Sequence, residues 1–219
     1  MSLVLYGHHF SSYTQKVIIA LYENNLPFEF RNLGPETPEH GAEWMRRWPL
    51  KKFPLLLDGD RDVVETSIII EYLHLTQKGP VRLLPDDPMA ALKVRFLDRF
   101  FDLHVMDAAQ HAVNGALTGK ADRREEGIAL SKEKLERSYA WLETELAGRT
   151  WAACDDFTMA DCAAAPSLFY ADWIYEIPEA YPTLRAYRAR LLRRPSFARA
   201  VDEARYFRKY FPLGAPDRD

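Results

Sequence analysis

The sequence predicts an α/β unit in the first third of the chain and an all-helical unit in the rest, joined by a linker. Strand-like and helix-like patterns alternate up to about residue 80, as in a layered α/β fold. Residues 80–88 contain three prolines, and no strand pattern follows them. We therefore expect domains at residues 1–80 and 89–219, with a linker at residues 81–88.

Strand, helix and strand patterns account for the first thirty residues. Residues 3–6 form an apolar run typical of a strand, and residues 28–30 alternate as in a second strand. Between them, Ser12 and Gln15 have the spacing of a capping box ahead of apolar residues at helical intervals. We therefore expect a helix that is capped by Ser12 and ends before Pro27.

The next segments predict a hairpin and a third helix. Residues 35–48 contain two prolines, a glycine and many polar groups, which indicates an irregular helix or loop anchored by Trp44. Residues 55–57 and 63–64 flank a turn-forming Asp-Gly pair, which predicts two antiparallel strands. Apolar residues from Ile68 onward recur on one helical face, and this helix should end near Gly79-Pro80.

Beyond the linker the sequence carries helical periodicity. Leu92, Phe96, Phe100 and Leu103 recur at helical intervals and mark the first long helix. Further helices are expected at residues 128–146, 158–168 and 184–191, the last of them ended by Pro195. Thr158 and Asp161 have capping-box spacing, and we expect them to stabilise the fold and to take no part in chemistry.

The composition narrows the classes of function. The chain has 219 residues, of which 47% are hydrophobic, so it can bury a substantial core. A formal net charge of −3 argues against nucleic acid or an anionic membrane as the main partner. Its two cysteines, Cys154 and Cys162, form no C-x-x-C motif, which suits a reducing cytoplasm. We expect a cytoplasmic protein without a signal peptide or membrane span, which binds a small molecule or peptide.

Three short segments occur in a fixed order in the α/β unit: Ser11–Val17, Lys51–Pro54 and Glu65–Thr66. Together with Phe157–Asp161 in the helical unit, they resemble motifs of the cytosolic glutathione transferase family. The resemblance covers nearly the whole chain, and the order and spacing of the motifs carry it. It implies an N-terminal thioredoxin-like domain, a C-terminal helical bundle domain and a homodimer. It also implies a serine-type enzyme, similar to the theta-like and related bacterial-type classes.

The resemblance implies that Ser11 is the catalytic hydroxyl. A hydroxyl that donates a hydrogen bond to the glutathione sulfur lowers the thiol pKa, and the N-terminus of the following helix acts in the same direction. The resulting thiolate is the nucleophile, and the enzyme holds it beside its target. Tyr6 and Tyr13 are alternative donors, and both Ser11 and Ser12 also suit a purely capping role.

The resemblance also implies which residues bind glutathione as co-substrate. Phe53, before a cis Pro54, presents its backbone to the cysteinyl unit, and Lys52 pairs with the glycyl carboxylate. Glu65 meets the γ-glutamyl ammonium, while the Thr66 hydroxyl and nearby helix amides hold its carboxylate. Each of these residues has a structural alternative as well: the start of a strand, a surface lysine, or the cap of a helix.

Further residues complete the expected site. His40 lies near a histidine that some classes of the family use against the glycyl carboxylate. A hydrophobic electrophile is expected between the two domains, against Phe10, Tyr13, Phe101, His104 and Val105. His104 and His111 are about 10 Å apart along a helix, too far to share a metal ion, so we expect no metal site.

The predicted reaction is attack of the glutathione thiolate on a carbon electrophile by addition or substitution. Isomerase, dehalogenase or peroxidase side activities are within reach of the same site. A different class of function is a binding or regulatory module that keeps the fold without turnover. A thiol oxidoreductase is a third alternative, which the lack of any cysteine before Cys154 disfavours.

Overall fold

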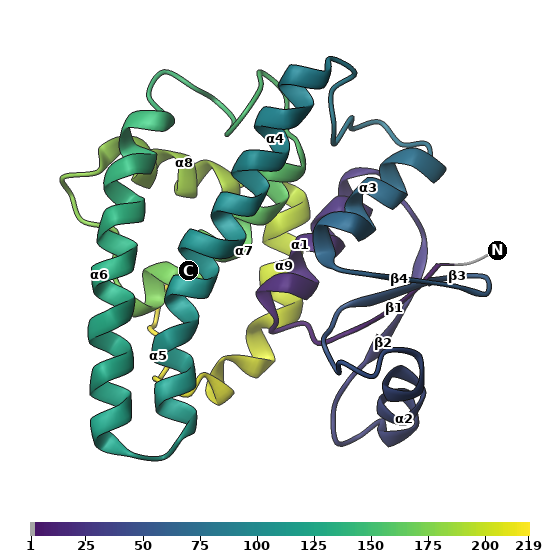
Figure 1. The fold of residues 1–219 in the computed structure, drawn as a ribbon, viewed down its shortest axis with the longest axis horizontal. Coiled ribbons are helices and arrows are strands. Elements are labelled where there is room, and N and C mark those ends of the chain that lie inside the picture. Colours follow the sequence, from purple (N-terminus) through teal and green to yellow (C-terminus); the bar gives the residue numbers. More distant parts are fainter. Residues whose placement is uncertain (1–2) are drawn as a thin grey trace.

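The computed structural model describes residues 3–219, and the sheet and its helices come first along the chain (Figure 1). The first elements are β1 (Leu3–Gly7), α1 (Ser12–Glu23), β2 (Phe28–Asn32), α2 (Pro38–Arg47), β3 (Leu55–Asp58), β4 (Arg61–Val64) and α3 (Thr66–Thr76). The later elements are helical: α4 (Pro88–Phe100), the π-helical η1 (Phe101–Met106), α5 (Asp107–Leu117), α6 (Ala121–Glu145), α7 (Met159–Ile174), α8 (Pro182–Leu192), α9 (Pro195–Ala204) and the 3-10 helix η2 (Arg205–Tyr210). Within residues 3–219, no helix combines the length and apolar character needed to cross a membrane.

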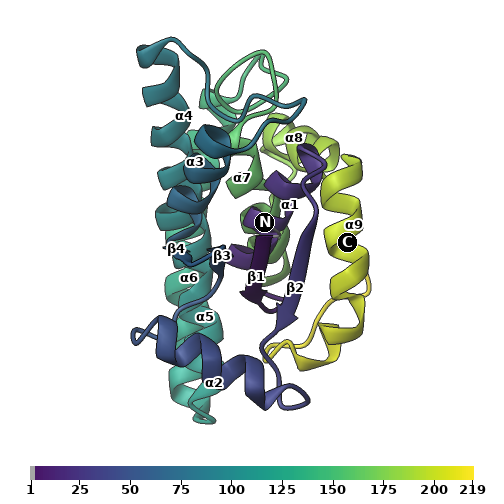
Figure 2. The same cartoon turned by 90° about the vertical axis from the view of Figure 1, so that its right-hand side faces the viewer.

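The four strands form one mixed sheet in the order β2-β1-β3-β4. β1 runs parallel to β2 and antiparallel to β3, which pairs with β4 in the predicted hairpin. Because side chains alternate along a strand, Leu5 faces one side of the sheet and Tyr6 the other. Leu5 joins the main core with α1 and α3, whereas Tyr6 packs toward Trp44 of α2. Figures 1 and 2 show α2 on the face of the sheet opposite to α1 and α3.

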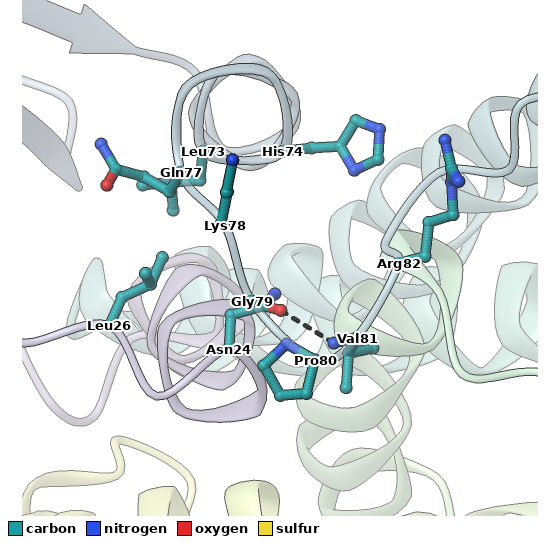
Figure 3. A pocket seen from close by; sticks show the side chains of 10 residues that line it. All are labelled: Asn24, Leu26, Leu73, His74, Gln77, Lys78, Gly79, Pro80, Val81 and Arg82. Carbon is teal, nitrogen blue, oxygen red and sulfur yellow. Dashed lines mark hydrogen bonds between the residues drawn. The ribbon is translucent and has the colours of Figure 1, made fainter.

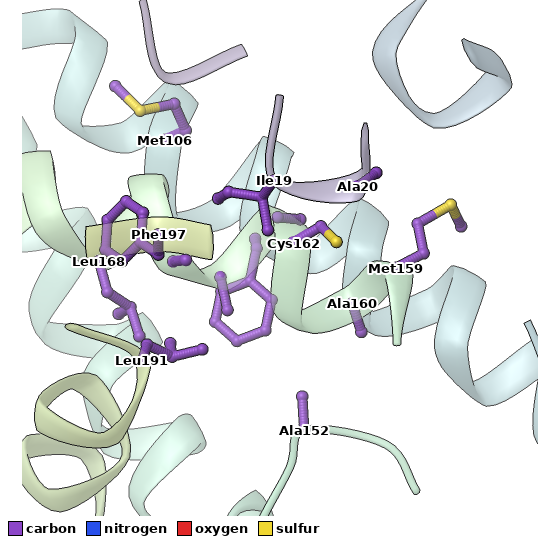
Figure 4. Close-up of a cluster of buried hydrophobic side chains, with 14 of the residues drawn as sticks. Ile19, Ala20, Met106, Ala152, Met159, Ala160, Cys162, Leu168, Leu191 and Phe197 are labelled. Carbon is purple, nitrogen blue, oxygen red and sulfur yellow. The ribbon is translucent and has the colours of Figure 1, made fainter. Parts of the chain in front are cut away.

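The helical part is organised around α7, whose residues from Met159 to Asp172 are all buried. Figure 4 shows Ile19 of α1, Cys162 of α7 and Phe197 of α9 in one cluster of buried side chains, so one core joins the sheet-bearing part to the helices. The predicted capping box at the start of α7 is confirmed. The Asp161 carboxylate accepts hydrogen bonds from the Ala152 and Thr158 amides and from the Tyr187 hydroxyl.

The predicted cap of α1 was wrong, and α4 buries other residues than those that mark it in the sequence. Ser11, and not Ser12, caps α1, because Ser11 has extended backbone angles and its side chain accepts a hydrogen bond from the Thr14 amide. The apolar residues that mark α4 in the sequence are partly exposed: Leu92 is 55% and Phe96 47% exposed. The buried residues of this helix are Ala91, Val94, Leu97 and Asp98. Both faces of α4 are apolar, so periodicity alone did not show which one is buried.

The segment after α3 is attached to the end of α1. The Asn24 side chain at the C-terminus of α1 accepts a hydrogen bond from the Val81 amide at 3.0 Å (Figure 3). Gly79 approaches Asn24 so closely that a β-carbon at this position would lie 2.1 Å from the Asn24 side-chain oxygen. This contact fixes the start of the expected linker against the sheet-bearing part.

Candidate functional site

Two adjacent cavities receive most of the predicted site residues. The Ser11 cavity, of about 690 Å³, is lined by the segment before α1, by α5, by α7 and by residues 210–212. The Glu65 cavity, of about 600 Å³, is lined by the start of α3 and by α4. Tyr13, Lys52 and Phe53 line both cavities, so the two meet at these residues.

Ser11 lies in the Ser11 cavity directly before α1, where β1 and its loop place it. Its hydroxyl oxygen accepts a hydrogen bond from the Thr14 amide at 3.2 Å. A serine hydroxyl has one donor and two acceptor positions, and within residues 3–219 no acceptor receives its proton. Capping the helix and donating to a ligand are therefore compatible roles for this side chain.

The two tyrosine alternatives to Ser11 have different surroundings. Tyr6 is fully buried on the α2 side of the sheet, contacts Arg31, and lines neither cavity. Tyr13 lines both cavities. Burial, together with the Asp102 and Asp107 carboxylates, raises the pKa of Tyr13 to about 12. Tyr13 therefore stays protonated near neutral pH and remains a second possible donor at the junction of the cavities.

Phe53 occupies the junction of the cavities with its backbone available to a ligand. The Phe53–Pro54 peptide bond is cis, as expected. Within residues 3–219, neither the Phe53 amide nor its carbonyl has a hydrogen-bond partner. The preceding residue is attached to α2, because the Trp44 indole donates a hydrogen bond to the Lys52 carbonyl at 3.1 Å. An unpaired peptide unit at this place can pair with the backbone of an extended peptide.

Glu65 and Thr66 meet at the start of α3, in the Glu65 cavity. Glu65 is the residue before the helix and has a φ of 68°, a left-handed conformation that costs a non-glycine residue about 1–3 kcal/mol. Its side chain makes no capping hydrogen bond. The first amides of α3 are therefore not used by a side-chain cap, and they form a suitable site for a carboxylate.

A buried charged cluster lies next to the start of α3 and was not anticipated from the sequence. The Lys16 ammonium lies 2.7 Å from a carboxylate oxygen of Asp98 and 2.7 Å from one of Asp102, and it donates to the Ser67 hydroxyl at 3.0 Å. Burial acts to lower the pKa of Lys16, but the two carboxylates outweigh it and raise that pKa. The cluster connects α1 and α3 to α4 and η1. Its only signal in the sequence is a lysine inside the apolar pattern of α1.

Four predicted residues lie outside both cavities. His40 points to the Asn32 carbonyl at 3.1 Å and reaches neither cavity. Phe101 and Val105 are fully buried in the core, and the His104 ring packs at a tilt against Phe100 with ring centroids 5.0 Å apart. For Phe101, His104 and Val105 the reason is local: residues 101–106 form a π-helical turn, which is wider than an α-helical turn and changes which side chains face the site.

Other residues take the places that were predicted for Phe101, His104 and Val105. The residues of η1, α5 and α7 that line the Ser11 cavity are Met106, Asp107, Gln110, Val113, Asn114, Leu117, Tyr170 and Ile174. Tyr210, Phe211 and Pro212 close the cavity from the C-terminal end of the chain. Asp107, Gln110 and Asn114 of this lining are polar, so the cavity is less hydrophobic than expected. Hydrophobic periodicity does not identify such residues, because the face of α5 that carries them is partly polar and is not the buried one.

A third cavity, of about 370 Å³, lies between the ends of α1 and α3 and the segment that follows α3 (Figure 3). It is lined by Asn24, His74 and Arg82 among others, and no predicted site residue reaches it. Within residues 3–219, no group of three His, Cys, Asp or Glu side chains is placed to hold a metal ion.

Comparison with known proteins identifies the family. The model of the glutathione S-transferase N-terminal domain matches residues 5–80, and that of the C-terminal domain matches residues 123–190. A probable maleylacetoacetate isomerase of Vibrio cholerae is 32% identical over 213 residues, which cover 93% of this chain and 97% of that protein. A glutathione S-transferase of Escherichia coli is 27% identical, with 91% of this chain and 97% of that protein covered.

Solved structures agree with the sequence relatives. A glutathione S-transferase from Methylobacillus flagellatus with glutathione bound has a TM-score of 0.77 and 26% identity, and covers 91% of this chain and 98% of its own. A glutathione transferase homologue from Drosophila mojavensis has the same fold, with a TM-score of 0.82, 23% identity and 98% of each chain covered. The chain belongs to the glutathione S-transferase family, with a thioredoxin-like N-terminal domain and a helical C-terminal domain.

Proposed function

We propose that this protein is a glutathione transferase whose co-substrate lies across the two joined cavities. The observation that carries the proposal is that the two cavities share Phe53 in their lining, with Ser11 in one cavity and Glu65 and Thr66 in the other. An extended tripeptide spans about 10 Å, at roughly 3.3–3.6 Å per residue, and can reach from one cavity into the other. The names of the Escherichia coli and Methylobacillus flagellatus relatives support glutathione as this peptide.

Each unit of glutathione has a partner in this arrangement. The Glu65 carboxylate pairs with the γ-glutamyl ammonium, and the Thr66 hydroxyl and first α3 amides hold the γ-glutamyl carboxylate. The Phe53 amide and carbonyl pair with the cysteinyl backbone, and Lys52 pairs with the glycyl carboxylate. The sulfur then lies in the Ser11 cavity.

The chemistry follows from the position of Ser11. Its free proton donates to sulfur and stabilises the thiolate, which lowers the pKa of the bound thiol. The thiolate attacks a carbon of an electrophile held in the Ser11 cavity, by addition or by substitution. Because the relative from Vibrio cholerae is named a probable isomerase, glutathione-dependent isomerisation is included among the reactions to test.

We also propose that the protein is a homodimer. Apolar side chains on α3, α4, η1 and α6 are exposed: Ile68 at 55%, Leu92 at 55%, Phe96 at 47%, Leu103 at 48% and Trp141 at 36%. α3 and α4 lie side by side in Figure 1, next to the Glu65 cavity. Contiguous exposed apolar side chains are typical of an interface between protein chains. Sedimentation equilibrium tests this proposal: the wild type should have twice the mass of one chain and Phe96→Asp the mass of one, and a monomeric wild type would contradict it.

Calorimetric titration of reduced glutathione tests the site itself. We expect one saturable binding event per chain, weakened at least tenfold by Glu65→Ala because the γ-glutamyl ammonium loses its partner. Glu39→Ala is the matched control, because Glu39 is exposed on α2 and lines neither cavity. Equal weakening by both substitutions, or no binding to the wild type at millimolar glutathione, would contradict the proposal. Binding without turnover of any electrophile would favour the alternative of a binding module.

A further inference from the structure

The lining of the Ser11 cavity includes an acidic side chain, Asp107, that the proposed function does not use. Within residues 3–219, its carboxylate has no hydrogen-bond partner and no ion pair. It does not cap α5 either, because Met106 and Asp107 both have helical backbone angles, so α5 continues η1 without free N-terminal amides. The Asp107 carboxylate is therefore free to pair with a ligand in the cavity.

The charges around Asp107 leave it without a partner in glutathione. The other polar side chains that α5 brings to the lining, Gln110 and Asn114, are uncharged and bond to each other at 3.1 Å. Lys51 and Lys52 also line the cavity, but they come from the segment proposed to hold the glycyl carboxylate. The ammonium of glutathione is proposed to lie in the other cavity. Asp107 is thus the acidic group that remains for the second substrate.

The negative charge of Asp107 acts inside the site and not only at its rim. Burial, followed by the Asp102 and Asp107 carboxylates, raises the pKa of Tyr13 to about 12, and Arg99 opposes this more weakly. Asp102 is paired with Lys16, whereas Asp107 has no such cation. A carboxylate that disfavours a phenolate anion at the junction of the cavities favours a cation at the same place.

Aromatic rings give the cavity a second feature that suits a cation. Phe10, Tyr170 and Phe211 are part of the lining. The Phe10 ring packs edge-on against the other two, with centroids 5.4 Å from Tyr170 and 6.3 Å from Phe211. The face of an aromatic ring attracts a cation, and proteins use such rings to bind alkylammonium groups. An alkylammonium group combines positive charge with apolar surface, so it fits a carboxylate beside aromatic rings.

We propose that the second substrate carries an alkylammonium group that Asp107 binds, and that the site favours cationic electrophiles over neutral or anionic ones of similar shape. This inference rests on the proposed transferase function. In a substitution, the thiolate sulfur forms a bond to carbon, the carbon–halogen bond breaks, and the halide leaves with the electron pair. The ammonium is present before and during this step. Its contact with Asp107 therefore lowers KM and leaves kcat nearly unchanged.

Three benzyl chlorides that differ in their para group test the preference for charge. The para groups are methyl, trimethylammoniomethyl and carboxymethyl, and each kcat/KM is divided by the rate constant of the uncatalysed reaction with glutathione. We expect the wild type to favour the cationic chloride over the neutral one about tenfold, through KM, and to disfavour the anionic one. Raising the ionic strength from about 0.01 M to about 1 M should reduce this preference, because the Debye length falls from about 30 Å to about 3 Å.

Substitutions assign the preference to one side chain. Asp107→Asn should remove most of the preference for the cationic chloride, and Asp107→Lys should favour the anionic one. Asp122→Asn is the matched control, because Asp122 is an exposed aspartate in the first turn of α6 and lines neither cavity. This control should keep the wild-type preference. Calorimetric titration of glutathione into each variant shows that it is folded and retains the co-substrate site.

The outcomes separate this inference from the proposed function. Equal normalised rates for the three chlorides in the wild type, a preference for the anionic one, or a preference for the cationic one that Asp107→Asn retains would each overturn the role of Asp107 and leave the transferase proposal standing. A wild type that binds glutathione and accelerates none of the three reactions would favour the binding module over the transferase, and the role of Asp107 would fall with it.

Discussion

The Glu65 cavity and the Ser11 cavity are built in different ways. In the Glu65 cavity, the residues proposed to bind glutathione come from two short segments, 52–54 and 65–66. The Ser11 cavity is assembled from the segment before α1, from α5, from α7 and from residues 210–212, which are far apart in the sequence. A ligand end held by a strand start and a helix start can be recognised from local sequence. A pocket that depends on how helices pack cannot be recognised from local sequence.

The largest expected effect concerns the fold that holds the two cavities together. Asp161→Ala removes a buried carboxylate that accepts from the Ala152 and Thr158 amides and from the Tyr187 hydroxyl. These donors would be left without a partner, so we expect the free energy of unfolding to fall by about 4 kcal/mol. Urea unfolding measures the change, with Asp156→Ala at an exposed neighbouring position as control. An unchanged unfolding midpoint would show that the motif does not have the predicted structural role.

Lys16→Met tests the cluster beside the Glu65 cavity. It leaves the Asp98 and Asp102 carboxylates buried without their cation, and we expect a loss of about 3 kcal/mol in the free energy of unfolding near pH 8. Burial raises the pKa of Asp102, and Lys16 opposes this, so the substitution raises that pKa further.

The expected pH dependence of Lys16→Met follows from that shift. The folded Asp102 carboxyl holds its proton more tightly than the unfolded one, so the folded state gains stability as the pH falls through the raised pKa. The deficit relative to the wild type should therefore shrink between about pH 8 and pH 5. Urea unfolding at several pH values measures it, and a deficit that does not change with pH would contradict the assignment.

Ser11→Ala tests whether the Ser11 cavity activates the thiol while the Glu65 cavity holds glutathione. Loss of the hydroxyl should raise the pKa of the bound glutathione thiol and reduce kcat/KM about tenfold or more, with glutathione affinity nearly unchanged. It should also lower stability by about 1 kcal/mol, because Ser11 caps α1. Ser11→Gly keeps most of the capping contribution without a donor, so it should lose the same activity with less loss of stability. Full activity in either variant would instead favour Tyr13 as the donor.

Thr66→Val should have a smaller effect, confined to the Glu65 cavity. The substitution keeps the shape of the side chain and removes the hydroxyl proposed to hold the γ-glutamyl carboxylate. We expect glutathione affinity to fall about fivefold, which corresponds to about 1 kcal/mol, and Thr66→Ser to restore it. Calorimetric titration measures both variants. If Thr66→Val bound glutathione as the wild type does, the backbone amides of α3 alone would hold the carboxylate.

The smallest effect is expected at His40. Its ring faces the Asn32 carbonyl and lines neither cavity. His40→Ala should change glutathione affinity by less than about twofold, or about 0.4 kcal/mol. A tenfold loss in the same titration would show that the glycyl end of glutathione extends beyond the two cavities toward α2.

The same contrast explains how far the sequence predicted the molecule. Ser11, Phe53 and Glu65 were selected from short sequence motifs, and each lines a cavity in the structure. Such motifs can be recognised because each lies at the end of a strand or the start of a helix. The prediction of α4 and η1 was less accurate, because α4 has two apolar faces and a π-helical turn follows it. Pro195 was expected only to end a helix, yet it lies in the first turn of α9, where proline is also favoured.

A crystal structure of the complex with S-hexylglutathione would test the central claim, that the two cavities form one glutathione site, most directly. We expect the γ-glutamyl carboxylate at Thr66, the sulfur within hydrogen-bond distance of the Ser11 hydroxyl, and the hexyl chain in the Ser11 cavity beside Met106 and Phe211. A ligand in the cavity beside Asn24, or one with its sulfur in the Glu65 cavity, would contradict the account.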